Sequence, residues 1–347
     1  LNIQHKTKLA QHKAPQIKTD LDELKRMVAL LPFKLTFSQK RSLWEILQDM
    51  DHPRPMNRLL QGDVGSGKTV VAVLAACVAA QNGYQTALMA PTEILAEQHF
   101  ATLTNLLARL KLSPQPAVGL VTGSGAKILY AEGLRADVKK EIFARKVSSG
   151  EIAVAVGTHA LISGKNKKSF SFKKLGLAVI DEQHRIGVRQ RALLIDDYSK
   201  KNAPLPQFLC MSATPIPRTF MLTIFGDLDI SLITEMPAGR KRVITKIVSP
   251  DERAAAYEFM REQIKTGRQV FVICPRISPA EENESAAEKN TARYYHSSLF
   301  KKLEIKSVTE EYEKLSQKVF PEFSVAMLHG QLKAKDKQEI MSKFREG

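Results

Sequence analysis

The chain has 347 residues, of which 44% are hydrophobic and 25% are charged, which is the composition of an ordinary globular protein. At this length we expect two domains, because one hydrophobic core seldom supports so long a chain. The formal net charge of +16 favours nucleic acid as a partner, although an acidic protein, a membrane surface or a merely solvated lysine-rich surface also fits such a charge.

Short apolar runs alternate with amphipathic stretches from about residue 68 to residue 233. This alternation predicts an α/β domain in which helices cover both faces of a mainly parallel sheet. The expected strands are residues 58–61, 86–90, 118–122, 152–156, 177–180 and 208–211.

Residues 235–242 read EMPAGRKR, a polar stretch without apolar periodicity that predicts a linker. The alternation then resumes, which predicts a second α/β domain. Its expected strands are residues 243–248, 269–274 and 324–329, and its expected helices are residues 251–266 and 333–344. Three strands are fewer than the five or six of a typical sheet, so we expect this second domain to be incomplete.

The three cysteines, Cys77, Cys210 and Cys274, are too far apart for clustered metal ligands, and their odd number does not fit a disulfide framework. They favour a reducing compartment. The longest apolar run, residues 70–80, is too short to cross a bilayer and predicts a core helix. The amino end is basic and polar, without the pattern of a signal peptide, so we expect a cytoplasmic protein that does not bind membranes. The first residue is Leu1, which suggests a piece of a longer protein.

The strongest motif is a phosphate loop that matches the pattern G-x-x-x-x-G-K-[ST], directly after an expected strand and directly before an expected helix. Its residues are Gly62, Asp63, Val64, Gly65, Ser66, Gly67, Lys68 and Thr69. Glycines let backbone N–H groups approach phosphate oxygens, and the helix N-terminus adds a positive field. We expect Lys68 to reach the β and γ phosphates and Thr69 to ligate Mg²⁺. The alternative is a plain glycine-rich turn.

Two adjacent carboxylates, Asp181 and Glu182, follow the expected strand 177–180. The carboxyl end of a strand is where α/β sheets place ligands. Asp181 can hold Mg²⁺ opposite Thr69, and Glu182 can orient or deprotonate the attacking water. An Asp-Glu pair alone is more often a solvated turn, and the phosphate loop upstream reverses that preference.

Two hydroxyls, Ser212 and Thr214, follow the expected strand 208–211 within the sequence MSATP. They could relay the nucleotide state from the triphosphate to the rest of the protein. Ser-x-Thr before proline is also good turn chemistry, so an ordinary turn remains the alternative.

In this order the motifs resemble the helicase core of superfamily 2, and several segments resemble the RecG-type ATP-dependent DNA helicases, which remodel branched DNA. The segments that carry the resemblance are residues 31–39, 90–99, 156–161, 181–191, 211–219, 274–277 and 329–330. The segment 181–191 is more discriminating, because related translocases usually carry glutamate where Gln183 stands.

The resemblance implies a fold of tandem RecA-like P-loop domains. Residues 31–235 would form the first domain, residues 236–347 the truncated start of the second, and residues 1–30 a linker from a missing wedge domain. The family's later motifs, including an arginine finger, would lie beyond Gly347. Loss of an arginine finger typically costs about 10³ to 10⁵ in rate.

The resemblance also implies ATP and Mg²⁺ as cofactors and branched or duplex DNA as the partner of a monomer. Phe33 and Gln39 would recognise adenine, while Gln183 and His184 would complete the catalytic motif. The DNA backbone contacts would be Thr92, Thr158 and His159. Residues 165–174, with five lysines around Phe170 and Phe172, could add an electrostatic grip or form a solvated hairpin. Two alternatives remain open, namely a nucleotide- and DNA-binding module without hydrolysis and an RNA helicase.

Overall fold

In the part of the chain that the structure describes, nine strands form one sheet in the order β5-β4-β3-β6-β2-β7-β8-β1-β9. All neighbouring pairs are parallel except β3–β4 and β4–β5, which are antiparallel. The strands are β1 Asn57–Gly62, β2 Gln85–Met89, β3 Ala117–Val121, β4 Ala126–Leu129, β5 Arg135–Val138, β6 Ile152–Gly157, β7 Leu175–Ile180, β8 Gln207–Ser212 and β9 Asp229–Ile233. The predicted α/β domain with a mainly parallel sheet is therefore confirmed, and each of its six expected strands is present.

The computed structural model describes residues 12–130, 133–158, 161, 170–182, 204–214, 228–236, 243–274, 307–332 and 334–346. The chain divides into two compact units, Leu1–Lys241 and Arg242–Gly347. The sheet belongs to the first unit. Among the described residues, no helix is both long and apolar enough to cross a membrane.

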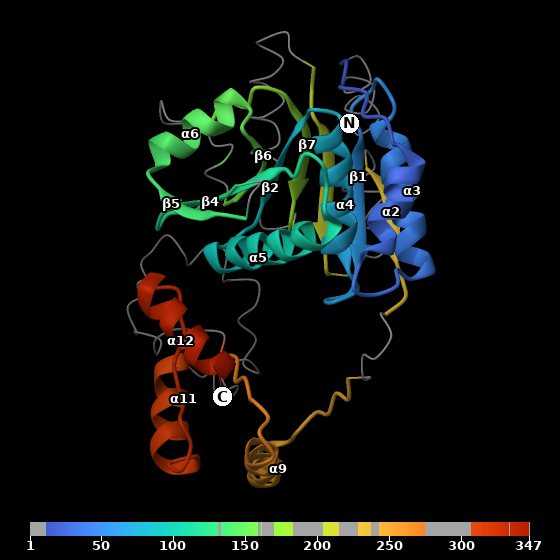
Figure 1. Ribbon diagram of the computed structural model, residues 1–347. Helices are drawn as coiled ribbons and strands as arrows, with labels where there is room; N and C mark the ends of the chain where they lie inside the picture. Colours follow the sequence, from blue (N-terminus) through green and yellow to red (C-terminus); the bar gives the residue numbers. More distant parts are fainter. Residues whose placement is uncertain are drawn as a thin grey trace, which may run out of the picture. The chain divides into compact units, whose positions relative to one another are not determined.

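Helices cover both faces of the sheet because neighbouring residues of each strand point to opposite faces. Leu60 of β1 joins the core beneath helices α3, α4 and α5, whereas Leu59 joins the core on the other face, where helix α6 contributes Phe143 and Val147. Helices α3 and α4 lie side by side next to β1 (Figure 1). The helices in the described residues of this unit are α2 Leu21–Ala29, α3 Phe37–Met50, α4 Lys68–Gln81, α5 Glu93–Leu110 and α6 Lys140–Ser149.

Helix α4 confirms the core helix expected from the apolar run. Every residue from Val70 to Ala79 is buried, because the helix lies between the sheet and α3. A helix that is apolar on all sides can be buried in this way without leaving a polar side chain in the core. The first turn of α4, which carries Lys68 and Thr69, is partly exposed.

The segment before residue 31, which we expect to be a linker, packs onto the first unit. Ile17 and Met27 are both 0% exposed and belong to the same core as α4. The Ile17 N–H donates to the Met50 carbonyl at 2.8 Å, and the Gln207 side-chain amide donates to the Pro15 carbonyl at 2.9 Å. Residues 12–30 are thus held by core packing as well as by hydrogen bonds.

The described part of the second unit is helical, and the prediction of strands there is wrong. Helices α9 Arg253–Lys265 and α12 Ala334–Glu346 match the expected helices, and α11 Val308–Lys314 adds a further one. Residues 243–248, 269–274 and 324–329 form no strand. A strand needs a hydrogen-bonded partner strand, and none of these segments forms a ladder with another strand among the described residues. Ile247 is 99% exposed and Ile273 is 91% exposed.

Candidate active site

The polar motifs of the first unit follow the ends of parallel strands and therefore meet at one edge of the sheet, called here the carboxyl edge. In strand order β6, β2, β7, β8, β1, the residues that follow are Thr158, then Thr92, then Asp181 with Glu182, then Ser212 with Thr214, and last the phosphate loop. The order of the sheet thus puts the expected nucleotide site at one end of this row. The two described residues expected to contact DNA lie at the other end, with the carboxylates and the two hydroxyls between.

The phosphate loop has a backbone that requires glycine at two positions. Gly65 has φ +75° and Gly67 has φ +90°, conformations that side chains with a Cβ rarely adopt. A Cβ on Gly67 would lie 2.3 Å from the Gln39 side-chain nitrogen, and one on Gly62 would lie 2.5 Å from the Ser66 hydroxyl. The loop is therefore closed tightly between β1 and α4.

The residues of this loop fit a nucleoside triphosphate bound with Mg²⁺. Helix α4 begins at Lys68, and its N-cap residue, Gly67, provides no side-chain cap, so the first N–H groups of the helix suit an anionic ligand. The buried Ser66 hydroxyl has no hydrogen-bond partner among the described residues. A buried donor of this kind is normally satisfied, and a phosphate oxygen would do so. Thr69 and Asp181 offer the oxygen ligands that Mg²⁺ prefers.

Lys68 points back into the loop. Its Nζ donates to the Gly62 carbonyl at 2.7 Å and to the Asp63 carbonyl at 3.0 Å. Burial lowers the pKa of Lys68, and the nearby charges of Asp181 and Glu182 oppose that fall. The lysine and the two carboxylates therefore share one electrostatic environment, although strands β2 to β6 separate their loops in the sequence. In the sheet, only β8 lies between the strands that carry them.

Asp181 and Glu182 lie at the end of β7. The Asp181 N–H donates to the Met89 carbonyl at 2.8 Å, and one carboxylate oxygen of Asp181 accepts the Glu182 N–H at 3.1 Å. Glu182 has φ +52°, an unusual conformation for a residue other than glycine. Strained backbone of this kind is concentrated at functional sites. The turn places two adjacent carboxylates at the carboxyl edge.

Gln39 connects the segment expected to recognise adenine with the phosphate loop. Its side-chain Nε2 donates to the Ser66 carbonyl at 2.7 Å, while its Oε1 accepts the Thr36 N–H at 2.9 Å. Thr36 in turn caps helix α3. Gln39 is buried, whereas Phe33 is 47% exposed and thus available to a flat ring such as a base. The structure thus brings Gln39 into direct contact with Ser66 of the phosphate loop.

Ser212 and Thr214 interact with each other, since their hydroxyl oxygens lie 2.9 Å apart. The Thr214 carbonyl accepts a hydrogen bond of 3.4 Å from the side-chain amide of Gln61, which lies in β1 just before the phosphate loop. This contact joins the Ser-x-Thr motif to the strand that carries the loop. Ser212 is buried and Thr214 is exposed.

The two described residues expected to contact DNA differ in exposure. Thr92 is exposed and caps helix α5, where its hydroxyl oxygen accepts the Leu95 N–H at 3.3 Å and keeps its own hydrogen for an outside acceptor. Thr158 is only 7% exposed. Phe170 and Phe172 of the lysine-rich run pack against the core. His159, Gln183 and His184 lie outside the described residues.

Two residues at this edge had no role in the sequence analysis. His99 of α5 lies 2.7 Å from the carboxylate of Asp181, and Glu235 accepts hydrogen bonds from Ser38 next to Gln39. His99 falls within the segment 90–99 that carries the family resemblance, which is the signal that could have identified it. Glu235 lies in the expected linker, where no local pattern predicts a contact with α3.

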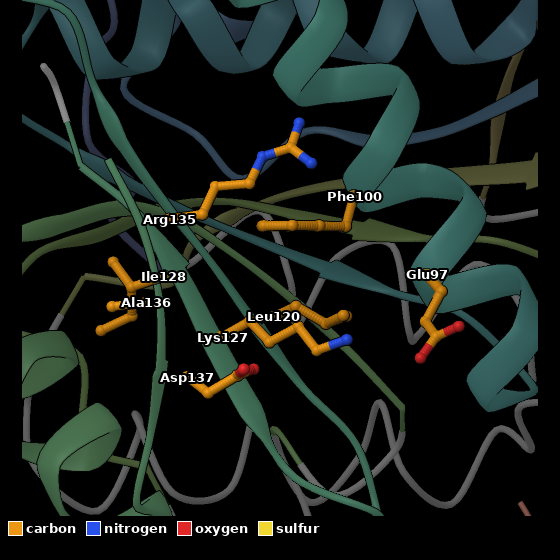
Figure 2. A pocket seen from close by; sticks show the side chains of 8 residues that line it. All are labelled: Glu97, Phe100, Leu120, Lys127, Ile128, Arg135, Ala136 and Asp137. Carbon is orange, nitrogen blue, oxygen red and sulfur yellow. The ribbon is translucent and has the colours of Figure 1, made fainter. Parts of the chain in front are cut away.

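A cavity of about 330 Å³ lies elsewhere, between α5 and strands β3, β4 and β5. In Figure 2, Phe100 and Glu97 come from α5, while Lys127 and Asp137 come from the two antiparallel strands. The two acidic and two basic residues that line it balance in charge, and no residue of the phosphate loop takes part. The cavity is therefore separate from the site at the carboxyl edge.

The chain is similar in sequence and in fold to known helicases. Residues 37–222 match the model of the DEAD/DEAH box helicase family. The chain is 45% identical to an ATP-dependent DNA helicase RecG of Synechocystis sp. over 93% of its own length and 34% of the relative's. It is 44% identical to the RecG of Aquifex aeolicus over 99% of its own length and 38% of the relative's. The chain thus spans little more than a third of these curated relatives.

A solved structure of RecG bound to a three-way DNA junction superimposes with a TM-score of 0.71 at 35% identity, covering 100% of this chain and 39% of that one. The DNA-bound helicase MrfA superimposes with a TM-score of 0.60 at 17% identity, covering 96% of this chain and 45% of that one, which supports the fold alone. The match to the family model covers more than half of the chain. The chain therefore belongs to the DEAD/DEAH box helicase family, and its sequence is of the RecG type.

Proposed function

We propose that this chain is the ATP-binding and DNA-contacting part of an ATP-driven motor that translocates on duplex DNA and remodels branched DNA during recombination and repair. The single observation that carries the proposal is the row of motifs along the carboxyl edge, with the phosphate loop at one end and Thr92 near the other. One sheet thus carries both the expected nucleotide site and the expected DNA contacts. The junction-bound RecG relative supports branched DNA as the substrate class.

The proposed roles follow from the chemistry of each group. Lys68 binds the β and γ phosphates, and the N–H groups of the loop and of the first turn of α4 donate hydrogen bonds to phosphate oxygens. Magnesium, when bound with the nucleotide, supplies charge neutralisation on the phosphates. Thr69 and Asp181 would hold it. Glu182 orients the attacking water and receives its proton, and Gln39 fixes the phosphate loop beneath the nucleotide.

DNA contact is proposed for Thr92, Thr158 and His159, while Ser212 and Thr214 transmit the nucleotide state. Hydroxyl groups donate to phosphate oxygens without reading bases, which suits a motor that moves along any sequence. The net charge of +16 adds non-specific attraction to the DNA backbone. We place the protein in the cytoplasm and expect a monomer.

ATP turnover measured with and without branched DNA tests this proposal, in the full-length gene product that carries this sequence. Branched or duplex DNA should stimulate hydrolysis, and Lys68→Ala or Glu182→Gln should each lower the stimulated rate by at least about 10²-fold. Turnover that survives both substitutions would contradict the proposal. Stronger stimulation by structured RNA than by duplex DNA would favour an RNA helicase instead.

A second candidate function is nucleotide and DNA binding without hydrolysis. It is favoured by the second unit, whose described residues form helices but no sheet. A motor of this type closes its nucleotide site with residues from a second domain. The 347 residues alone would then bind nucleotide and DNA without hydrolysing ATP. DNA-stimulated turnover by these 347 residues would exclude this candidate.

A further inference from the structure

Helix α5 and strand β7 are joined by a buried contact between two polar side chains. The Nε2 atom of His99 lies 2.7 Å from Oδ2 of Asp181. The two residues are only 7% and 8% exposed. An ionised carboxylate can only accept hydrogen bonds, so the imidazole donates. The other oxygen of Asp181 accepts the Glu182 N–H, and both oxygens of the carboxylate are therefore held in place.

The same aspartate is also tied to the start of the loop that leads into α5. The Asp181 N–H donates to the carbonyl of Met89, the last residue of β2. Thr92 follows three residues after Met89, and His99 follows seven residues after Thr92. Asp181 thus holds both sides of the segment that carries Thr92, by its backbone on one side and its carboxylate on the other.

The neighbouring strand is joined to this segment in the same way. Gly157 of β6, Met89 of β2 and Ile180 of β7 are aligned in register. The Ala90 N–H donates to the Gly157 carbonyl at 2.8 Å, directly before Thr158. Backbone hydrogen bonds therefore link the residues next to Thr158 and before Thr92 to Asp181, through Gly157, Ala90 and Met89.

We propose that His99 is a positioning residue for Asp181, and that this pair couples DNA contact at Thr92 to the carboxylate that would hold Mg²⁺. The inference rests on the proposed function, because that function gives Asp181 and Thr92 their roles. Partners that orient a metal ligand typically contribute about 10- to 100-fold to metal affinity or activity. His99 can act as such a partner because it contacts Asp181 directly and is buried. It also lies on α5, the helix that Thr92 caps.

The test compares His99→Leu, which keeps a similar volume but has no donor, with His99→Gln, which keeps a donor amide. The first measurement is the Mg²⁺ concentration that half-saturates binding of a fluorescent, non-hydrolysable ATP analogue, which involves no turnover. His99→Leu should raise this concentration about 10-fold, and His99→Gln should restore it to within about threefold of the original protein.

The second measurement is turnover with and without DNA. His99→Leu should lower the DNA-stimulated kcat about 10-fold while leaving the Kd for DNA within about twofold, and His99→Gln should recover most of the stimulation. A His99→Leu protein with unchanged Mg²⁺ dependence and unchanged stimulation overturns the inference. A His99→Gln protein as impaired as His99→Leu does so too, because the ring would then matter for packing alone.

Thr104→Val provides the matched control on the same helix. Thr104 is 2% exposed, and its hydroxyl donates to the Ala101 carbonyl of α5 rather than to the carboxyl edge. Thr104→Val should leave both the Mg²⁺ dependence and the DNA stimulation unchanged. Losses as large as those of His99→Leu would refute a specific role for the contact with Asp181. If Lys68→Ala fails to weaken Mg²⁺-dependent nucleotide binding, the proposed function itself fails. If Lys68→Ala abolishes binding but His99→Leu changes nothing, only the inference fails.

Discussion

The carboxylate of Glu235 accepts two hydrogen bonds from Ser38, one from the backbone N–H at 2.9 Å and one from the hydroxyl at 3.1 Å. Ser38 lies in the first turn of α3, where backbone N–H groups lack partners within the helix. The next residue, Gln39, reaches the phosphate loop through Ser66. A residue near the end of the first unit therefore holds the first turn of the helix that contacts the phosphate loop.

The contact between Glu235 and Ser38 predicts a pH-dependent stability. The backbone hydrogen bond from Ser38 is the main cause that lowers the pKa of Glu235 below its ordinary value of 4.5. A carboxyl group whose pKa is lower in the folded state stabilises the fold above pH 4.5, and this stabilisation is lost as the pH falls towards the lowered pKa. Glu235→Ala should therefore lower the Tm at pH 7, and the difference from the original protein should shrink below pH 4.5. Thermal unfolding at pH 7 and at a pH below 4.5 measures this. A Tm difference between the two proteins that is equal under both conditions would contradict the prediction.

Replacement of Gln39 should weaken both the fold and nucleotide binding. Gln39→Ala leaves the buried Ser66 carbonyl and the Thr36 N–H without partners, at a cost of about 1–3 kcal/mol in the free energy of unfolding. The affinity for ATP should fall about 10-fold, because the phosphate loop loses its support. Denaturant unfolding and titration with a fluorescent nucleotide measure the two effects.

Gln39→Glu is the informative comparison for that experiment. It keeps an acceptor for the Thr36 N–H but cannot donate to the Ser66 carbonyl. It should therefore reproduce the loss of nucleotide affinity. If Gln39→Glu binds nucleotide as tightly as the original protein, the hydrogen bond to Ser66 does not support the loop.

Two glycines with similar backbone conformations should respond differently to alanine. Gly83 has φ +74° and no atom within 4 Å of an added Cβ, so Gly83→Ala should cost only the strain of the conformation, about 1–2 kcal/mol. Gly67 has φ +90°, and its Cβ would meet the Gln39 amide, which is buried and hydrogen-bonded at both ends. Gly67→Ala should cost more than Gly83→Ala and should also abolish nucleotide binding. Urea unfolding of both variants measures the loss in the free energy of unfolding. Equal losses would show that crowding around Gly67 does not affect stability.

The cysteines should react with thiol reagents at very different rates. Cys77 is buried in α4, and burial raises its pKa to about 12. At pH 8 its thiolate fraction is on the order of 10³-fold below that of an ordinary cysteine. Cys210 is also buried, whereas Cys274 is partly exposed. Mass spectrometry after brief maleimide treatment should find the label on Cys274 first, and rapid labelling of Cys77 in the folded protein would contradict the burial of α4.

The central sheet and the phosphate loop could be predicted because their signals are local. The loop follows a fixed spacing, and the six expected strands are apolar runs buried on both faces. The antiparallel strands β4 and β5 have only four residues each, and the exposed positions of β5 break its apolar pattern. The edge strand β9 also contains exposed positions, so its apolar pattern is weak too. Short edge strands carry too few buried positions for periodicity to identify them.

The contacts that complete the site could not be predicted, because they join distant parts of the chain. His99 and Asp181 are 82 residues apart, and Ser38 and Glu235 are 197 residues apart. Only tertiary packing brings such pairs together. The wrongly expected strands of the second unit illustrate the converse, since residues 243–248 have a strand-like pattern, but a pattern alone does not provide a partner strand.

The antiparallel pair β4–β5 offers a place to attach the protein to a surface or a fluorophore. Leu129 pairs with both Val118 and Arg135, so the connection between the two strands lies at the edge of the sheet opposite the phosphate loop. Leu134, in that connection, is 64% exposed. A tether there would leave the carboxyl edge open to solvent, so that the proposed movement along DNA could be tested on a single immobilised molecule.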